Sequence, residues 1–216
     1  DTALAEARMS RDRALISKSA QNLALVQREL GDMADARERI DTAVAAARDA
    51  GNARTLGTAL NNKGMLEIAW GHPAEALPLL AEARRQYASI EYRPGHVNAL
   101  GQVASAYEAL GDFASAFAAA DSAIALARTL GMRQEEAGSL ELLASIHRSA
   151  GEPRKALAVY QQAETINREL GLPVERGTDL RETARIYLEL GELEAARRRA
   201  EAAVQVHRDT DAGAER

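Results

Sequence analysis

The sequence from Thr58 to Ala76 reads TALNNKGMLEIAWGHPAEA. Its apolar residues recur at helical spacing as far as Trp70, Gly71 then interrupts the pattern, and Pro73 opens a second helical segment. The same pattern returns when the frame is shifted by 40 residues in either direction. Self-similarity at a fixed period indicates a repeat array, so the stretch predicts stacked pairs of helices.

Four columns of small residues support this interpretation, because the same kind of residue stands at one place in every copy. Glycine ends the first helix of each pair, alanine follows five residues later and again twelve residues later, and a small residue stands seven residues before the glycine. In these places we expect two helices to cross closely. The columns are Gly31, Gly71, Gly111, Gly151 and Gly191; Ala36, Ala76, Ala116, Ala156 and Ala196; Ala43, Ala83, Ala123, Ala163 and Ala203; and Ala24, Gly64, Ala104, Ala144 and Ala184.

The columns also set the boundaries of the predicted repeats. Residues 1–10 resemble residues 41–50, so the sequence is expected to open on the second helix of a truncated leading repeat. A polar tail is expected at residues 211–216. Between these ends we predict five 40-residue repeats, at 11–50, 51–90, 91–130, 131–170 and 171–210.

The repeat ends follow one rule with one exception. A glycine supplies the left-handed residue that closes a helix, and Gly51, Gly131 and Gly171 end the second helices in this way. In the second repeat Glu91 takes the place of the glycine, and Arg93-Pro94-Gly95 follows. We therefore expect a differently shaped turn at this point.

Composition excludes several classes of protein. Aromatic residues make up 4% of the chain and there is no cysteine, which favours closely packed helices and excludes disulfides. With a net charge of −5, the chain lacks the excess of positive charge that favours binding to nucleic acid or an anionic membrane. No apolar run is long enough to span a membrane. Without a charged-then-apolar leader, a cytoplasmic location is expected.

The pattern resembles the tetratricopeptide repeat, in a long variant with a 40-residue period. That family has a small residue in the middle of the first helix, a glycine at the turn and two alanines in the second helix, as seen here. Leu60-Asn61-Asn62-Lys63-Gly64 is similar to a Leu-Asn-Asn-Leu-Gly phrase of its long-period members. The resemblance implies an all-α, right-handed α-α superhelix, a solenoid of helix-turn-helix repeats. The first helix of each repeat would line the concave inner wall.

The expected inner wall offers two groups of candidate binding residues. Amides carry a donor and an acceptor together, so they suit the backbone of an extended peptide. The amide candidates are Asn22, Asn61, Asn62, Asn98 and Gln102; alternatively, these side chains bond neighbouring helices or solvent. Arginines can hold carboxylates of a partner; alternatively, they pair with Glu141, Glu182 and Glu189. The arginine candidates are Arg148, Arg181 and Arg185.

No motif indicates catalysis, a metal site or a cofactor. The histidines lack zinc-ligand spacing, and neither a glycine-rich phosphate loop nor a Ser/His/Asp set is visible. The sequence therefore predicts a non-enzymatic scaffold that binds a protein or peptide ligand in its concave groove, within a larger bacterial signalling or regulatory protein. The alternatives are a ligand-sensing domain that controls an attached output domain, and a structural spacer or oligomerisation module. Cut array ends would expose apolar faces, so self-association is a further expectation.

Overall fold

The computed structural model describes residues 12–214 of the chain, with side chains described for residues 12–210. The half-repeat expected at residues 1–10 lies outside this range. All regular structure in the described range is α-helical, which confirms the predicted all-α class. Contacts divide the chain after Asp112 into two units, and each unit is described by itself.

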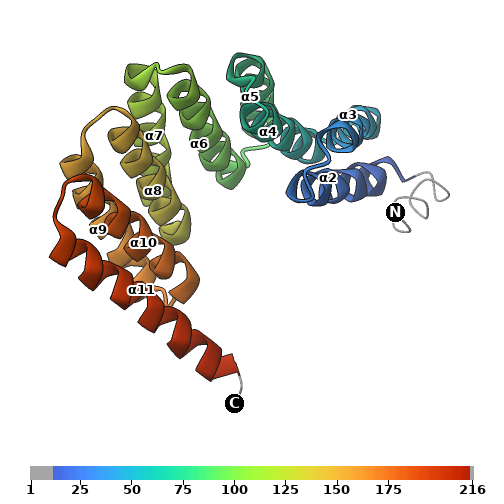
Figure 1. Cartoon of the computed structure of the whole chain (residues 1–216). Helices are drawn as coiled ribbons and strands as arrows, with labels where there is room; N and C mark the ends of the chain where they lie inside the picture. Colours follow the sequence, from blue (N-terminus) through green and yellow to red (C-terminus); the bar gives the residue numbers. More distant parts are fainter. Residues whose placement is uncertain (1–11, 215–216) are drawn as a thin grey trace. The chain divides into compact units, whose positions relative to one another are not determined.

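Over its described residues, the first unit has two helix pairs and a fifth helix (Figure 1). α2 packs along α3, α4 packs along α5, and α6 lies against both α5 and α4. α4 also contacts α2 and α3, so the first two pairs form a stack. The bounds are α2 Arg13–Glu29, α3 Met33–Ala50, α4 Ala53–Ala69, α5 Pro73–Ser89 and α6 Arg93–Leu110.

The second unit repeats this arrangement. α8 packs along α9 and α10 along α11, while α7 lies against α8 and α9 lies against α10. α11 continues to Ala214, so residues 211–214, expected to belong to a polar tail, extend the last helix. The bounds are α7 Phe113–Thr129, α8 Arg133–Ser149, α9 Pro153–Glu169, α10 Pro173–Glu189 and α11 Leu193–Ala214.

The turn after α5 corrects part of one expectation. Glu91 adopts φ +52°, the left-handed conformation that glycine adopts at the other turns. Its N–H bonds to the carbonyl of Ala88, and the next N–H bonds to the carbonyl of Tyr87. Gly131 and the residue after it make the equivalent two bonds. The two bonds that close the turn are therefore the same as at Gly131. The residue before it differs, because the N–H of Ile90 bonds to the carbonyl of Tyr87, three residues back, whereas that of Leu130 bonds to Leu126, four residues back.

The columns of small residues lie where the helices approach most closely. The alanines at positions 36, 76, 116 and 156 are fully buried, and so are those at 43, 83, 123 and 163. At Gly64 a Cβ atom would lie 2.7 Å from Cδ2 of Leu80, which is too close for any larger residue. The repeat pattern therefore reflects packing between helices.

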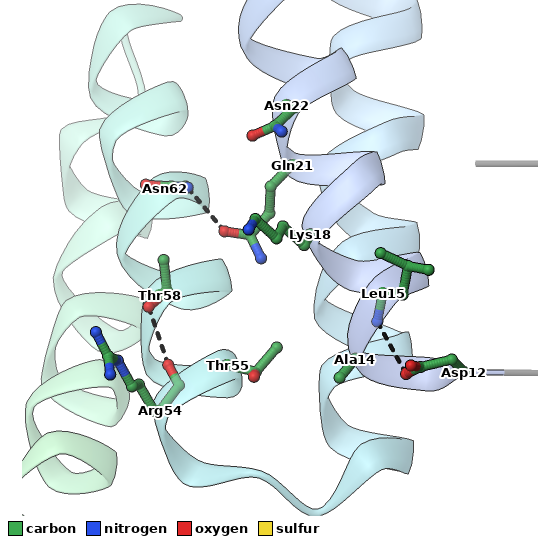
Figure 2. Close-up of a pocket in the computed structure, with 10 residues that line it drawn as sticks. All are labelled: Asp12, Ala14, Leu15, Lys18, Gln21, Asn22, Arg54, Thr55, Thr58 and Asn62. Carbon is green, nitrogen blue, oxygen red and sulfur yellow. Dashed lines mark hydrogen bonds between the residues drawn. The ribbon is translucent and has the colours of Figure 1, made fainter. Parts of the chain in front are cut away.

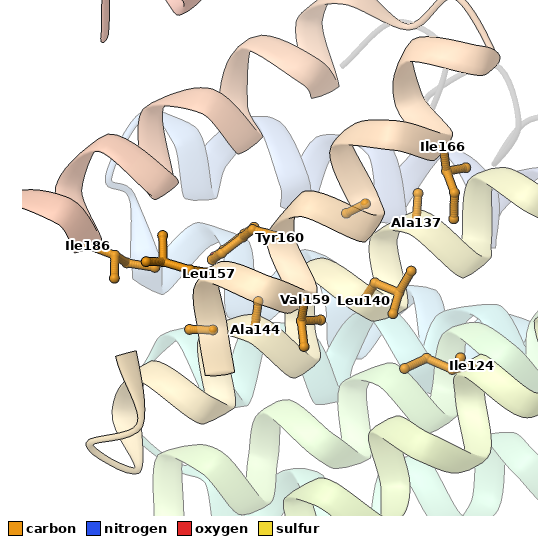
Figure 3. Packing of buried hydrophobic residues seen from close by; sticks show 11 residues of the cluster. Ile124, Ala137, Leu140, Ala144, Leu157, Val159, Tyr160, Ile166 and Ile186 are labelled. Atoms are coloured by element: carbon orange, nitrogen blue, oxygen red, sulfur yellow. The ribbon is translucent and has the colours of Figure 1, made fainter. Parts of the chain in front are cut away.

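Each unit has apolar clusters between its helices. Figure 3 shows the largest cluster of the second unit, in which Leu140 and Ala144 of α8 pack with Leu157 and Tyr160 of α9. Ile186 of α10 joins the same cluster. Because most of these side chains are small or aliphatic, the helices are held mainly by close packing. Over the described residues, no helix has the length and apolar character needed to cross a membrane.

Candidate functional site

A cavity of about 560 Å³ opens between α2 and α4 in the first unit (Figure 2). Both helices are first helices of predicted repeats, so the cavity lies on the wall where the sequence predicts ligand contacts. Most of the side chains around it are polar. The lining residues are Asp12, Ala14, Leu15, Lys18, Gln21, Asn22, Arg54, Thr55, Thr58 and Asn62.

Two cations line this cavity, one from each helix. Lys18 is exposed on α2 and forms no ion pair with another described residue. Arg54 is exposed at the start of α4, and its Nη2 donates to the hydroxyl oxygen of Tyr92 at 3.1 Å. Asp12 also lines the cavity, where its carboxylate accepts from the backbone N–H of Leu15 at 3.1 Å. The cavity thus offers two positive charges that no carboxylate of the described residues pairs with.

The amides in the cavity have different roles. Asn62 donates from Nδ2 to Oε1 of Gln21 at 2.9 Å, and Gln21 donates from Nε2 to the hydroxyl of Ser17 at 3.1 Å. This chain of bonds joins α4 to α2, so part of the amide group predicted for a ligand connects neighbouring helices. Asn22 is exposed and makes no hydrogen bond to another described residue. Of the amides, Asn22 is therefore the most available to a ligand.

The remaining amide candidates of the first unit lie outside the cavity lining. Asn61 is half-buried on α4, and its Oδ1 is buried without a hydrogen-bond partner among the described residues. Asn98 is exposed on α6, and Gln102 is half-buried one turn further along the same helix. The structure therefore places Asn22 and Asn62 in the cavity lining, and leaves Asn61, Asn98 and Gln102 outside it.

The arginine candidates belong to the second unit and already have acidic partners. Nε of Arg148 lies 3.0 Å from Oε1 of Glu189, and Glu182 is 3.7 Å from its Nη1. Arg185 lies 3.3 Å from Glu182, and Arg181 lies 3.7 Å from the same residue. These pairs match the alternative that the sequence left open. Pairs made by the exposed Arg181 and Arg185 contribute little stability, whereas Arg148 and Glu182 are half-buried.

Two of these arginines border a second cavity, of about 450 Å³, between α10 and α11. Its floor is mainly apolar, in contrast to the cavity of the first unit. The lining residues are Gly177, Arg181, Ala184, Arg185, Leu188, Ala200, Ala203, Val204 and His207.

Asp179 is buried between α8, α9 and α10, beside acidic residues that are half-buried. Asp179 is fully buried and accepts from Nδ2 of Asn167 at 2.8 Å, while its other oxygen has no partner among the described residues. The same Nδ2 donates to Glu141 at 3.0 Å. Burial, together with the nearby charges of Glu141, Glu164 and Glu175, raises the pKa of Asp179 to about 7. Burial also raises the pKa of Glu141.

One group of described side chains has the spacing of metal ligands: Glu67, His72 and Glu75. Nη2 of Arg37 lies 3.1 Å from Oε2 of Glu67 and 3.2 Å from Nδ1 of His72. A guanidinium group thus already neutralises the buried carboxylate.

The fourth repeat has the same arrangement, but with His147 at the position of Glu67 and Glu152 at the position of His72. Nδ1 of His147 lies 2.7 Å from Glu152, which also accepts from Nζ of Lys155 at 2.7 Å. Because the two turns share this arrangement and each includes a cation of the chain, ion pairing at the turn accounts for the group.

Besides Asp12, Ala14 and Leu15, the lining residues that the sequence reasoning missed are Arg54 and Thr55. They lie in the first turn of α4, whereas the expected inner wall was taken from the middle of each first helix. One signal was present in the sequence. The positions equivalent to Arg54 hold Ala14, Pro94, Gln134 and Val174, so this column contains a single arginine.

The chain matches the family model of the tetratricopeptide repeat over residues 12–89 and 95–169. It therefore belongs to the tetratricopeptide repeat family, whose members are typically protein-interaction scaffolds. No curated protein matches the sequence.

Several solved structures share the fold. BtubC from P. vanneervenii is 17% identical with a TM-score of 0.78, and the match covers 97% of this chain and 89% of that one. A putative kinesin light chain from Podosopora anserina with nearly identical TPR-like repeats is 21% identical with a TM-score of 0.68, covering 90% and 95%.

The third comparison is a Rap protein complexed with Competence and Sporulation Factor. It is 13% identical with a TM-score of 0.78; the match covers 90% of this chain and 54% of the Rap chain. At these identities the likeness shows the fold alone.

Proposed function

We propose that this protein is a non-catalytic scaffold that binds an extended peptide segment in the cavity between α2 and α4, and that a carboxylate of the peptide lies between Lys18 and Arg54. The observation that carries the proposal is the pair of cations without a carboxylate partner among the described residues, one on each wall of a 560 Å³ cavity. Charge-assisted hydrogen bonds to a carboxylate are among the stronger polar contacts in proteins.

Around this charged pair, the neutral polar groups suit a peptide backbone. Asn22 offers an amide donor and acceptor, and Thr55 and Asn62 also line the cavity. Because α2 and α4 are rigid helices, little order is lost when a ligand binds. The Rap protein of similar fold was solved in complex with a factor, which supports a bound partner for this fold.

The candidate residues outside this cavity have a smaller part in the proposed binding. Asn61, Asn98 and Gln102 in the first unit, and Arg148, Arg181 and Arg185 in the second, are proposed as secondary contacts of a longer partner. A place in a bacterial signalling or regulatory protein, and a cytoplasmic location, are part of the same proposal.

A small anionic effector is the second candidate ligand. The cavity volume falls within the range of small-molecule sites, about 300–1,000 Å³. In that case the protein would be a sensor domain whose ligand acts on an attached output domain.

The test uses a random heptapeptide library in two forms, one with free carboxylates and one with all carboxyl groups amidated. We expect the purified chain to select peptides from the first form only. By isothermal titration calorimetry, Lys18→Ala and Arg54→Ala should each weaken binding of a selected peptide about tenfold, because each removes a charged contact. Asn22→Ala should weaken binding a few-fold.

Arg93→Ala is the matched control, because it removes a positive charge beside the α5–α6 turn from a residue that does not line the cavity. It should leave affinity unchanged. Selection of amidated peptides would contradict the proposal. So would a Lys18→Ala or Arg54→Ala variant that binds the selected peptide with the affinity of the wild type. Failure to select any peptide, together with binding of small dicarboxylates, would favour the sensor function instead.

A further inference from the structure

The end of α5 is the only helix end among the described residues where a residue other than glycine adopts positive φ. Glu91 adopts this conformation at a cost of about 1 kcal/mol relative to glycine. Immediately after it, Tyr92 stands at the N-cap of α6 without a side-chain capping bond. Tyr92 packs against an apolar cluster of the first unit, and the equivalent positions in the second unit hold the apolar residues Met132 and Leu172, so what distinguishes this repeat is the aromatic ring.

Tyr92 is held in place by a second tyrosine. The rings of Tyr87 and Tyr92 lie 5.5 Å apart, at an angle of 60°. Tyr87 is 3% exposed, and a Cβ atom at Gly57 or Gly95 would lie 2.6 or 2.7 Å from its Cε1. Tyr87 thus fills a space that two glycines leave free, and its ring supports that of Tyr92.

Tyr92 in turn holds Arg54. The guanidinium carbon of Arg54 lies 4.3 Å from the centre of the Tyr92 ring, and its Nη2 donates to the Tyr92 hydroxyl at 3.1 Å. The backbone of Arg54 is also fixed, because its carbonyl accepts from the hydroxyl of Thr58 at 2.9 Å. Free arginine side chains have many rotamers, and these contacts restrict them before a ligand arrives.

Equivalent positions elsewhere do not repeat this arrangement. Ala14 and Asn52 occupy the two places in the preceding repeat, and Gln134 and Leu172 occupy them in the second unit. Neither pair combines a cation with an aromatic ring. The Arg54–Tyr92 contact is therefore tied to the one repeat whose first helix lines the 560 Å³ cavity with an arginine.

We infer that Tyr92 is a positioning residue of the binding site: it holds the Arg54 guanidinium at the cavity wall, ready for a ligand carboxylate. This inference rests on the proposed function. The glycines at positions 57 and 95 serve the same end, because they leave free the space that the Tyr87 ring fills.

The first test examines the ligand-free protein by NMR. The Nε–H signal of Arg54 is assigned as the one that is missing from the spectrum of Arg54→Lys. Stacking over a ring should shift this signal. We expect the shift to persist in Tyr92→Phe, which keeps the ring, and to vanish in Tyr92→Leu. An unshifted signal in the wild type, or a shift that survives Tyr92→Leu, would overturn the inference.

The second test measures binding of N-acetylglutamate by NMR titration. We expect Tyr92→Leu to weaken binding about tenfold and Tyr92→Phe only about two- to threefold, because the ring contact is retained. In an Arg54→Ala background, Tyr92→Leu should cause no further loss, because the two residues act together. A further loss in that background would show a general structural effect and contradict positioning.

The two proposals fail in different ways. If N-acetylglutamate does not bind the wild type while the Arg54 signal is shifted by the ring, the carboxylate site is wrong and the Tyr92–Arg54 contact stands. If the acid binds and Arg54→Ala weakens it, but Tyr92→Leu does not, the site stands and the positioning role is wrong. Melting temperatures of the Tyr92 variants serve as the folding control.

Discussion

Asp179 lies fully buried on α10, with one hydrogen bond from Asn167 and one oxygen without a partner among the described residues. Burial raises its pKa from 3.8 to about 7, so the folded chain binds a proton that the unfolded chain has released. The contribution of this group to stability is therefore greatest below about pH 4, falls between about pH 4 and 7, and stays low above that range.

Replacing the carboxyl group of Asp179 should remove its contribution to the pH dependence of stability. The side-chain oxygen of an amide at this position would still accept from Asn167, so we expect Asp179→Asn to stabilise the protein at pH 8 by on the order of 2 kcal/mol. At pH 5 the two proteins should differ much less. Urea unfolding at both pH values measures this. Equal stabilisation at pH 5 and pH 8 would show that the buried charge is not the cause.

At the scale of residues, the roles of some side chains could be predicted from the sequence and those of others could not. Gly64 and the alanine columns could be predicted, because every repeat needs the same close contact at the same place. Arg54 stands out in the sequence only as the single arginine of its column, and its placement could not be predicted, because it depends on Tyr92, 38 residues later in the chain. Asn62 shows the same limit: its partner Gln21 lies on another helix. Contacts that occur once leave no periodic signal in the sequence.

At the scale of elements, the helix ends are nearly uniform and Glu91 is the exception. Residue 91 and the residue after it make the same backbone bonds as Gly131 and its successor, so a glycine fits at position 91. We expect Glu91→Gly to stabilise the protein by about 1 kcal/mol, because glycine adopts positive φ without steric cost. The urea midpoint measures the effect.

Arg85→Gly is the matched control for this substitution. Arg85 is exposed within the same helix, α5, where glycine should destabilise by about 1 kcal/mol. Opposite signs for the two glycine substitutions would support the conformational explanation. If Glu91→Gly also destabilises, then the Glu91 side chain makes a contribution that outweighs its backbone strain.

At the scale of the whole molecule, stability should be local rather than shared evenly. Each described helix packs mainly on its neighbours along the chain, and contacts gather within two units. In such an array the stability is approximately a sum over repeats and the interfaces between neighbours. A disturbance in one unit should therefore have its main effect on helices of that unit.

Ala163→Leu provides the test of this expectation. Ala163 is fully buried on α9 in the largest cluster of the second unit, so a leucine should overpack it by about 1–3 kcal/mol. We expect hydrogen exchange of amides in α8, α9 and α10 to become about 10- to 100-fold faster, because local opening becomes easier. Amides of α2, α3 and α4 should exchange at nearly their original rates. A uniform acceleration across both units would mean that the chain opens as one cooperative body, and that the division after Asp112 has no energetic counterpart.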